Sequence, residues 1–216
     1  MSFKPSVYQQ AVYDHITNGK GNAVIDAVAG SGKSTTIVNA LKLIPKTARV
    51  LFLAFNKAIV EELKIKVGEL DNVDIRTLHS LGSSVIRKAF RTNLDGSKYR
   101  SYINQMVKFG NIKPVKELEW EEMGSYRSNI HKLVDIARVN LCEDKDTLFE
   151  LARKHNLFIF DNEIEMAFKV INWGKNNVGT HDFTDMIYLP NVLKLDAHVQ
   201  RFDYVFIDEC QDLNAC

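Results

Sequence analysis

A glycine-rich segment, Asp26–Thr36 with the sequence DAVAGSGKSTT, constrains the fold of this chain more than any other feature. A short apolar run at residues 22–25 precedes it, and apolar residues at helical spacing follow it. Apart from Ala27, which stands at the position of the first glycine, the segment fits the phosphate-loop pattern GxxxxGK[ST]. The order of strand, glycine loop and helix predicts an α/β fold with a phosphate-binding loop.

Each residue type in this loop has a mechanical role. Gly30 and Gly32 allow the backbone to bend until successive N–H groups point at an anion, beside the positive end of the following helix. Lys33 is expected to reach the β- and γ-phosphates of a nucleoside triphosphate, and the Ser34 hydroxyl to ligate Mg²⁺. The alternative is a flexible Gly-Ser turn, which the strand-to-helix context argues against.

An acidic pair near the end of the chain complements the loop. The segment Arg201–Asn214 reads RFDYVFIDECQDLN, in which Tyr204–Ile207 predicts a short apolar strand. Asp208 is expected to hold Mg²⁺, and Glu209 to position and deprotonate an attacking water. Two adjacent carboxylates repel each other without a cation, which gives the metal hypothesis a physical basis.

Two further strand–helix units lie between these motifs. The run Arg49–Phe55 is almost continuously apolar, as in a strand buried on both faces of a parallel sheet, and Ala58–Val67 has the apolar stripe of a helix. Val73–Thr77 predicts a second strand, and a helix is expected from Leu78 to about Phe90.

Polar residues stand where these two strands end. Asn56 and Lys57 follow the first strand, and Thr77 and His79 lie at the end of the second. Ligands of open α/β sheets collect at the carboxyl ends of strands, so these residues are candidates for ligand contact. Asn56 is equally well explained as a helix cap, and a lone histidine such as His79 is more often a capping or packing residue.

From Arg91 to about Asn177 the pattern becomes helical, with no convincing strand. Basic and aromatic residues alternate there, a pattern that can follow a single nucleic-acid strand, but interrupting glutamates favour solvated helix faces. We therefore predict a nucleotide-binding α/β domain formed by residues 1–90 and 178–216, and an all-helical insertion formed by residues 91–177.

The bulk composition agrees with a globular protein. The chain has 216 residues, 45% of them hydrophobic, and a net charge of +1 that provides no general attraction to nucleic acid. Its three cysteines lack CxxC spacing, which suits a reducing compartment and argues against structural zinc. The amino terminus has no apolar signal core, and no apolar run is long enough to span a bilayer, so we expect a cytoplasmic protein without a membrane partner.

Together these segments resemble the ATP-binding domain of UvrD/Rep-type superfamily one DNA helicases, especially the branch related to F-box and phage helicases. The loop of that family reads AxAGSGKT, which accommodates Ala27. VFIDECQDLN resembles its DEAQD box, with Cys210 in place of alanine. LAFNKAIVEELK and RTLHSLG resemble motifs along the path of single-stranded DNA, and PSVYQQAV resembles the glutamine motif that reads adenine. HDFTDM resembles the family's DFxDL segment, and all the matches occur in family order.

The resemblance implies roles for individual residues. Gln9 fits the register of the adenine-reading glutamine best, with Gln10 as the reserve, and Gln211 is implied to have a coupling role. Asp182 and Asp185 of the DFxDL-like segment are equally well explained as a helix-capping pair. The implied sites are nucleotide-binding Gln9, Ala29, Gly30, Ser31, Gly32, Lys33, Ser34 and Thr35; catalytic Lys33, Asp208, Glu209 and Gln211; metal-binding Ser34 and Asp208; and DNA-binding Asn56, Lys57, Thr77 and His79.

The resemblance also implies a fold and an activity, with an ATP-binding domain formed by residues 1–90 and 178–216 and an accessory insertion formed by residues 91–177. The fold is that of a RecA-like P-loop NTPase, with a sheet that is incomplete because the chain stops just past the Walker B strand. The full-length parent is implied to be an ATP-dependent DNA helicase of a bacterial or phage-infected cell, using ATP and Mg²⁺ to move along single-stranded DNA and to open single-strand/double-strand junctions. The second RecA-like domain would supply arginines to the γ-phosphate, so this chain alone is expected to bind nucleotide with little turnover.

Two other classes of function compete with this interpretation. A P-loop kinase would need an arginine-rich lid and would leave the DNA-motif matches as coincidences. A non-catalytic module would hold nucleotide or single-stranded DNA without turnover.

Overall fold

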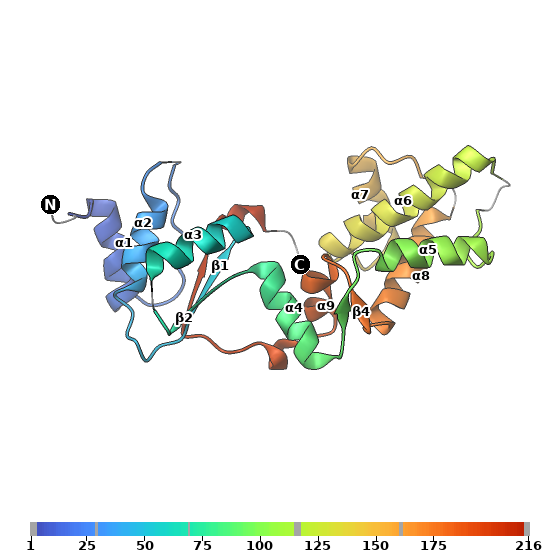
Figure 1. Ribbon diagram of the computed structural model, residues 1–216. Coiled ribbons are helices and arrows are strands. Elements are labelled where there is room, and N and C mark those ends of the chain that lie inside the picture. Colours follow the sequence, from blue (N-terminus) through green and yellow to red (C-terminus); the bar gives the residue numbers. More distant parts are fainter. Residues whose placement is uncertain (1–3, 29, 69, 115–117, 160–161, 214–216) are drawn as a thin grey trace. The chain divides into compact units, whose positions relative to one another are not determined.

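The computed structural model describes residues 4–28, 30–68, 70–114, 118–159 and 162–213 (Figure 1). The chain forms two compact units. The first unit comprises Met1–Leu78 with Arg201–Cys210, and the second comprises His79–Gln200 with Gln211–Cys216. Each unit therefore combines segments that are distant in the sequence.

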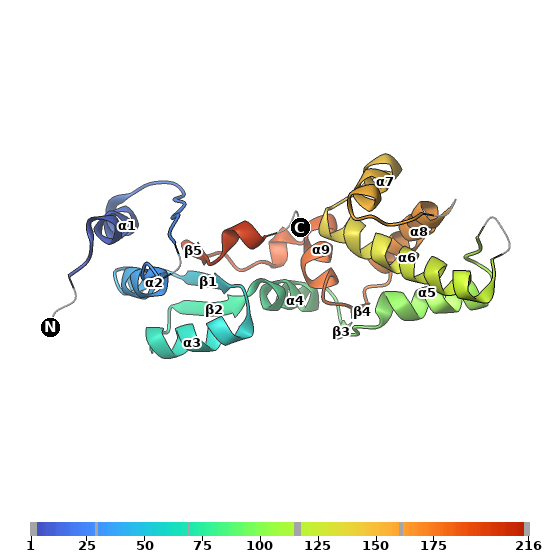
Figure 2. The same ribbon diagram turned by 90° about the horizontal axis from the view of Figure 1, so that it is seen from above.

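A parallel three-stranded sheet organises the first unit (Figures 1 and 2). Its strands are β1 (Val50–Ala54), β2 (Val73–Thr77) and β5 (Tyr204–Ile207), and β1 lies in the middle. Ala54 pairs with Thr77 on one side of β1, and Leu53 pairs with Ile207 on the other. The sheet therefore brings the carboxyl ends of all three strands to one edge, as expected from the sequence for β1 and β2.

The burial of each strand follows from its place in the sheet. All five residues of β1 are buried, which explains its uninterrupted apolar sequence. β5 alternates instead, with Tyr204 and Phe206 half-buried and Val205 and Ile207 exposed. The Phe206 ring stacks on Phe52 of β1, with ring centroids 6.1 Å apart. One face of β5 thus joins the core of the first unit.

Three helices accompany this sheet: α1 (Val7–Asn18), α2 (Lys33–Leu41) and α3 (Lys57–Val67). The apolar stripes of α2 and α3 pack on the sheet face that carries the even-numbered residues of β1. The core contributed by these elements consists of Val38, Leu41, Val50, Phe52, Ala54, Val60, Leu63, Val67 and Ile75. This packing fixes the amino termini of α2 and α3 relative to the sheet.

The strand predicted at residues 22–25 is not formed. Val24 is 86% exposed and Ile25 is 51% exposed, and the segment belongs to neither a helix nor a strand. A strand needs a neighbour to pair its backbone groups, and among the described residues the sheet ends at β5, which pairs with β1 alone. Local hydrophobicity indicates a strand here, but the segment pairs with no strand of the described residues.

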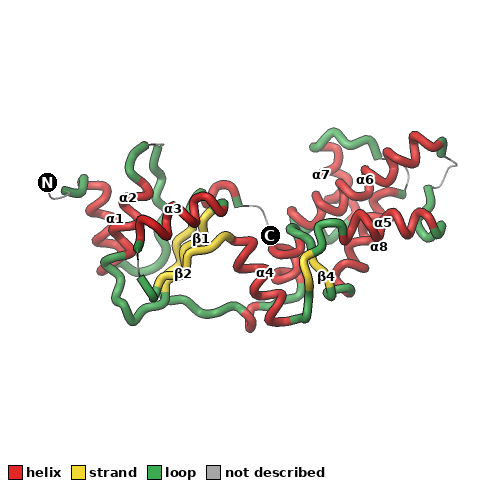
Figure 3. Tube along the Cα trace, in the orientation of Figure 1, coloured by secondary structure: helices red, strands yellow, loops and turns green. Residues whose placement is uncertain are grey.

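Helices dominate the second unit (Figure 3). Their bounds are α4 Leu78–Ala89, α5 Lys98–Lys108, α6 Trp120–Val139, α7 Lys145–Lys154, α8 Glu163–Asn176 and α9 Asp185–Val192, with short 3₁₀ turns η1 Asp196–His198 and η2 Cys210–Asp212. Two-residue strands, β3 (Asn93–Leu94) and β4 (Thr180–His181), also pair in parallel. The expectation of no strand from Arg91 to Asn177 is therefore wrong for β3, whose exposed pair of residues is too short to give a periodic signal.

Helix α6 supplies much of the core of the second unit. Its residues Ile130, Leu133 and Val134 are fully buried against side chains from α5, α7 and α8. Tyr126 is also fully buried, and its hydroxyl donates to Asn162 Oδ1 at 2.8 Å. Tyr126 lies in the segment where basic and aromatic residues alternate, but it belongs to the core and is therefore unavailable for stacking on nucleic acid.

The boundaries of the units differ from the expected domain boundaries. Helix α4 and helix α9 pack within the second unit, where the backbone of Gly82 lies directly against the Met186 carbonyl. A Cβ atom at position 82 would clash with that carbonyl oxygen, so the close approach of these helices requires glycine. Compactness does not assign function, and the division into an ATP-binding domain and an accessory insertion stays a prediction.

The end of α9 offers a test of backbone strain. Lys194 has φ 52° and is exposed, and Leu195 N donates to Pro190 O at 2.9 Å in the helix-terminating pattern that usually carries glycine. Lys194→Gly should stabilise the second unit by about 0.5 kcal/mol, because glycine adopts this conformation without strain. Thermal unfolding measures this change. Lys132→Gly, in the middle of α6, is the control and should destabilise the unit by about 1 kcal/mol.

Candidate nucleotide-binding site

Two glycines of the loop have the left-handed backbone conformation that helps to form an anion cradle. Gly30 has φ 76° and Gly32 has φ 87°, both in the left-handed region, and Gly32 immediately precedes α2. Thr36 N donates to Gly32 O at 2.9 Å, so the helix begins directly at the loop. The amino terminus of α2, with its unpaired N–H groups and positive dipole, is a suitable place for phosphate. Ala29, assigned to the same cradle, lies outside the described residues.

Lys33 and Glu209 form the contact that joins the two motifs. The Lys33 Nζ atom lies 3.4 Å from Glu209 Oε1, although the residues are 176 positions apart in the sequence. Their side chains are 35% and 32% exposed. Glu209 has φ 50°, an uncommon conformation for a residue other than glycine, of the kind found at functional sites. The phosphate loop and the end of β5 therefore meet in one site.

Asp208 stands at the junction of β5 and this site. Its backbone N–H donates to Leu53 O at 2.9 Å, which extends the β1–β5 ladder by one residue. Burial, together with the adjacent charge of Glu209, raises the pKa of the Asp208 carboxyl group, and nearby Lys33 only partly opposes this rise. A carboxylate in this environment is stabilised by an added cation.

The donor atoms at this edge suit a hard divalent cation. Ser34 directly follows Lys33 in the first turn of α2, and Asp208 directly precedes Glu209, so a hydroxyl and a carboxylate are each one residue along the chain from the ion pair. Oxygen ligands of this type are preferred by Mg²⁺, which usually keeps waters and substrate phosphate oxygens as its other ligands. The described residues contain no group of three His, Cys, Asp or Glu side chains arranged to hold a metal by themselves. The residues fit Mg²⁺ in combination with a phosphate ligand.

Gln9 lies beside the phosphate loop. It occupies the first turn of α1, where its side chain and that of Ser6 form a capping box. The Gln9 Nε2 atom donates to Thr36 Oγ1 of α2 at 2.9 Å. Gln10 instead donates to Asp14 of its own helix, at 2.8 Å. The contact with α2 favours Gln9 over Gln10 as the residue at the site, and its adenine-reading role stays a prediction.

Thr36 is a site residue that the sequence analysis missed. It is 7% exposed, and its hydroxyl contacts both Gln9 Nε2 and the Gly32 carbonyl. A threonine one turn after the last loop glycine can donate a hydrogen bond from its hydroxyl to that glycine's carbonyl. This possibility is the only local feature of the sequence that indicates where the Thr36 side chain lies. The contact with Gln9 depends on the packing of α1 on α2. Ser31 and Thr35, also assigned to nucleotide binding, have exposed side chains at this end of α2.

The candidates for DNA contact stand at the ends of strands. Asn56 caps α3 by accepting from Ile59 N at 3.0 Å, so the helix-cap interpretation of this residue is confirmed. Lys57 is exposed at the start of α3, and Thr77 ends β2 at the same edge of the sheet. His79 is exposed in the first turn of α4 and belongs to the second unit. Contact of these residues with DNA stays a prediction.

Gln211 follows the acidic pair but belongs to a different unit. It lies in η2 and its side chain is exposed. The unit boundary falls between Cys210 and Gln211, so only Asp208 and Glu209 of the catalytic assignments accompany Lys33 in the first unit. The coupling role of Gln211 stays a prediction.

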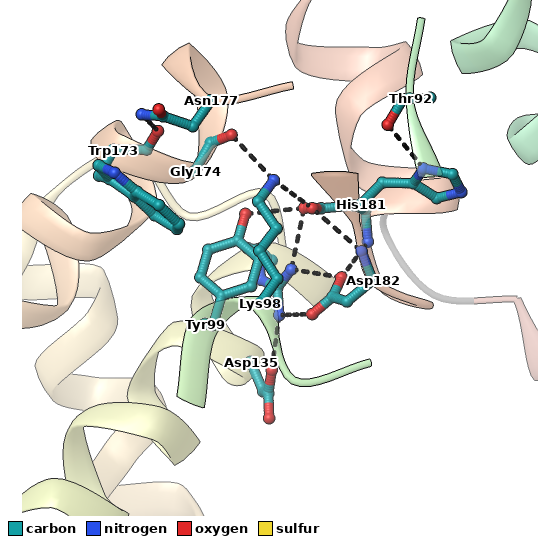
Figure 4. A network of polar contacts seen from close by, with 11 residues as sticks. Thr92, Lys98, Tyr99, Asp135, Trp173, Gly174, Asn177, His181 and Asp182 are labelled. Atoms are coloured by element: carbon teal, nitrogen blue, oxygen red, sulfur yellow. Dashed lines mark hydrogen bonds and ion pairs between the residues drawn. The ribbon is translucent and has the colours of Figure 1, made fainter. Parts of the chain in front are cut away.

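The DFxDL-like segment forms part of a buried network in the second unit (Figure 4). Asp185 is fully buried and accepts from Lys98 Nζ at 2.8 Å, from Tyr99 OH at 2.7 Å and from Arg138 Nη1 at 2.9 Å. Asp182 accepts from both terminal nitrogens of Arg138, at 2.8 and 2.9 Å. These contacts connect α9 and the segment between β4 and α9 with α5 and α6.

The two aspartates also have the geometry of a helix-capping pair. Asp182 Oδ1 accepts from Asp185 N at 2.7 Å, as the capping alternative predicts. The Arg138 guanidinium lies 3.8 Å from the centroid of the Tyr99 ring, and burial raises the pKa of the Tyr99 hydroxyl. Sequence reasoning missed Lys98 and Arg138, because neither has a local signal that distinguishes it from a solvated basic residue. Within the second unit this network is structural, because its buried ion pairs and hydrogen bonds join helices that are far apart in the sequence.

Comparison with known proteins identifies the family. The model of the UvrD/REP helicase N-terminal domain matches residues 8–216. The chain belongs to the UvrD/REP helicase family. The predicted resemblance is thereby confirmed, whereas its branch stays a prediction. No curated protein matched the chain.

The family membership gives the site its chemical context. A UvrD/REP helicase N-terminal domain is a DNA helicase ATP-binding part, which implies the use of ATP, usually with Mg²⁺. ATP and single-stranded DNA are the partners that the helicase family suggests. The helicase domain has a mixed α/β structure with a small parallel sheet, consistent with this family. None of its described helices combines the length and the apolar character needed to cross a membrane.

Proposed function

We propose that this helicase domain binds ATP and Mg²⁺ between its glycine loop and the carboxylates that follow β5, as the first RecA-like half of an ATP-dependent DNA helicase. The observation that carries the proposal is the 3.4 Å contact between Lys33 and Glu209. A glycine loop alone would indicate a phosphate site. A glycine loop whose lysine contacts one of two adjacent strand-terminal carboxylates has the parts of a triphosphate-hydrolysing site.

Each residue of the site takes a separate role in this proposal. Gly30 and Gly32 orient main-chain N–H groups toward the phosphates, and Lys33 balances the charge of the β- and γ-phosphates. Ser34 and Asp208 would hold Mg²⁺, which supplies neutralisation of phosphate charge when bound. Glu209 accepts a proton from the attacking water.

The same sheet edge supports a path for single-stranded DNA. Lys57 and Thr77 follow neighbouring parallel strands, and Lys57 is exposed at the start of α3. We propose that these residues and Asn56 contact the DNA backbone in the first unit, and that His79 contacts DNA as a residue of the second unit. The helical part of the second unit would then be the accessory insertion of the helicase. In the first unit, ATP and DNA would bind at the same edge of the sheet, which is formed by the carboxyl ends of its parallel strands.

A pair of lysine variants tests the proposal. Lys33→Ala should weaken binding of ATP in the presence of Mg²⁺ by roughly 10- to 100-fold, because a charged contact with the phosphates is lost. Lys57→Ala is the matched control and should leave ATP affinity unchanged while weakening binding of a single-stranded oligonucleotide. Isothermal titration of both ligands measures these effects. Equal ATP affinity for Lys33→Ala and the unaltered chain would refute the nucleotide site.

A further inference from the structure

The hydrogen bonds of Gln9 define which way its side-chain amide faces. Its Oε1 atom accepts from Ser6 N at 3.0 Å, and its Nε2 atom donates to Thr36 Oγ1 at 2.9 Å. A backbone N–H can only donate, so the amide oxygen has to face Ser6 and the amide nitrogen has to face Thr36. The orientation of the amide therefore follows from the chemistry of its partners.

Thr36 completes this arrangement from the other side. Its hydroxyl lies 3.0 Å from Gly32 O, which can only accept, so the hydroxyl donates to Gly32 and accepts from Gln9. The Gln9 amide also lies over the loop, because a Cβ atom added to Gly32 would be 3.4 Å from Gln9 Nε2. Thr36 is 7% exposed, so water has little access to replace these hydrogen bonds. One hydroxyl thus links Gln9 to the carbonyl at the end of the phosphate loop.

We propose that Thr36 is a positioning residue that sets the base specificity of the nucleotide site by holding the Gln9 amide in one orientation. This inference rests on the proposed function and goes beyond it, because the family resemblance assigns no role to Thr36. Thr36 acts through Gln9 and needs no contact with the nucleotide.

The chemical basis is the hydrogen-bonding capacity that Gln9 retains. A side-chain amide has two N–H donors and two acceptor lone pairs, and Ser6 and Thr36 use one of each. Among the residues that the structure describes, one donor and one acceptor of the amide remain without a partner. Adenine presents an acceptor at N7 and a donor at N6, which match this pair, whereas guanine presents acceptors at both N7 and O6. An amide fixed by Thr36 therefore selects adenine over guanine.

The test compares ATP and GTP affinities of the 216-residue chain with Mg²⁺, measured by equilibrium dialysis. The unaltered chain should prefer ATP. Thr36→Val, which removes the hydroxyl at nearly constant volume, should reduce the ratio of ATP to GTP affinity on the order of fivefold, the worth of one ordinary hydrogen bond. Thr36→Ser keeps the hydroxyl and should restore the ratio. Thr36→Ala replaces the valine variant if that variant does not fold.

A double variant separates positioning from a general structural role. In a Gln9→Ala background the ratio should already be low, and Thr36→Val should not lower it further. An unaltered chain that binds both nucleotides equally, or a Thr36→Val ratio equal to that of the unaltered chain, would overturn the inference. The inference would also be overturned if Thr36→Val lowered the ratio of ATP to GTP affinity equally with and without Gln9. A different result refutes the proposed function itself, namely nucleotide binding that is unchanged by Lys33→Ala.

Discussion

Replacing Asp185 with alanine is expected to destabilise the second unit by about 3–5 kcal/mol. Asp185 is fully buried, and its carboxylate is an acceptor for Lys98 and Arg138, whose side chains are also fully buried. Removing the carboxylate takes the ion-pair partner from Lys98, takes one of three carboxylate partners from Arg138, and leaves a donor of Tyr99 without its acceptor. The cost comes mainly from charges that cannot regain water, so it exceeds the loss of an ordinary hydrogen bond.

Denaturant unfolding followed by Trp173 fluorescence measures this effect. Trp173 stacks on Tyr102 at 3.7 Å and meets the Tyr99 ring edge-on, so its emission reports on the second unit. The chain has two tryptophans, and a Trp120→Phe background leaves Trp173 as the single probe.

Asp135 provides the matched control for this experiment. Its carboxylate also accepts from Arg138, at 2.7 Å, but its side chain is 42% exposed. Asp135→Ala should therefore cost no more than about 1 kcal/mol. Tyr99→Phe, which removes one hydrogen bond to Asp185, should cost about 1 kcal/mol and gives a folded variant if Asp185→Ala unfolds the unit. Equal effects of Asp185→Ala and Asp135→Ala would contradict the importance of burial.

Glu209→Gln is expected to relax the magnesium requirement of nucleotide binding. Glu209 pairs with Lys33, so a nucleotide that binds Lys33 without metal has to displace Glu209, whose charge then stays unpaired by Lys33 beside Asp208. Mg²⁺ offsets this cost because it neutralises the remaining charge. Glutamine removes the competing charge at nearly constant size. The ratio of ATP affinities with and without Mg²⁺ should fall about tenfold, equivalent to about 1.4 kcal/mol.

Calorimetric titration of ATP with Mg²⁺ and with EDTA measures this ratio. Glu61→Gln is the matched control, because Glu61 pairs with Lys64 at 3.8 Å on α3 of the same unit and has no proposed role at the site. It should leave the ratio unchanged. An unaltered ratio in Glu209→Gln would show that the contact of Lys33 with Glu209 does not compete with nucleotide.

Much of the site could be predicted from the sequence because its signals are local. The loop glycines, the apolar strands and the polar residues at their ends occur within short windows, and β2 and β5 begin and end where the pattern predicts. Their order along the chain also indicated the helicase family, which the match over residues 8–216 confirms. The segment at residues 22–25 shows the limit of such signals, because a strand also needs a neighbour for its backbone groups.

The sequence by itself determined the residue types of the phosphate loop, the strand-terminal carboxylates and the family of the chain, since these depend on spacing within a few turns or strands. Only the tertiary structure decided which distant side chains meet. The pairing of Lys33 with Glu209 follows from the placement of β5 beside β1, and the contact of Gln9 with Thr36 follows from the packing of α1 on α2. The buried ion pair of Arg138 with Asp185 depends in the same way on the packing of α6 with α9, which are far apart in the chain. Such contacts arise from long-range packing, which no local pattern of residues encodes.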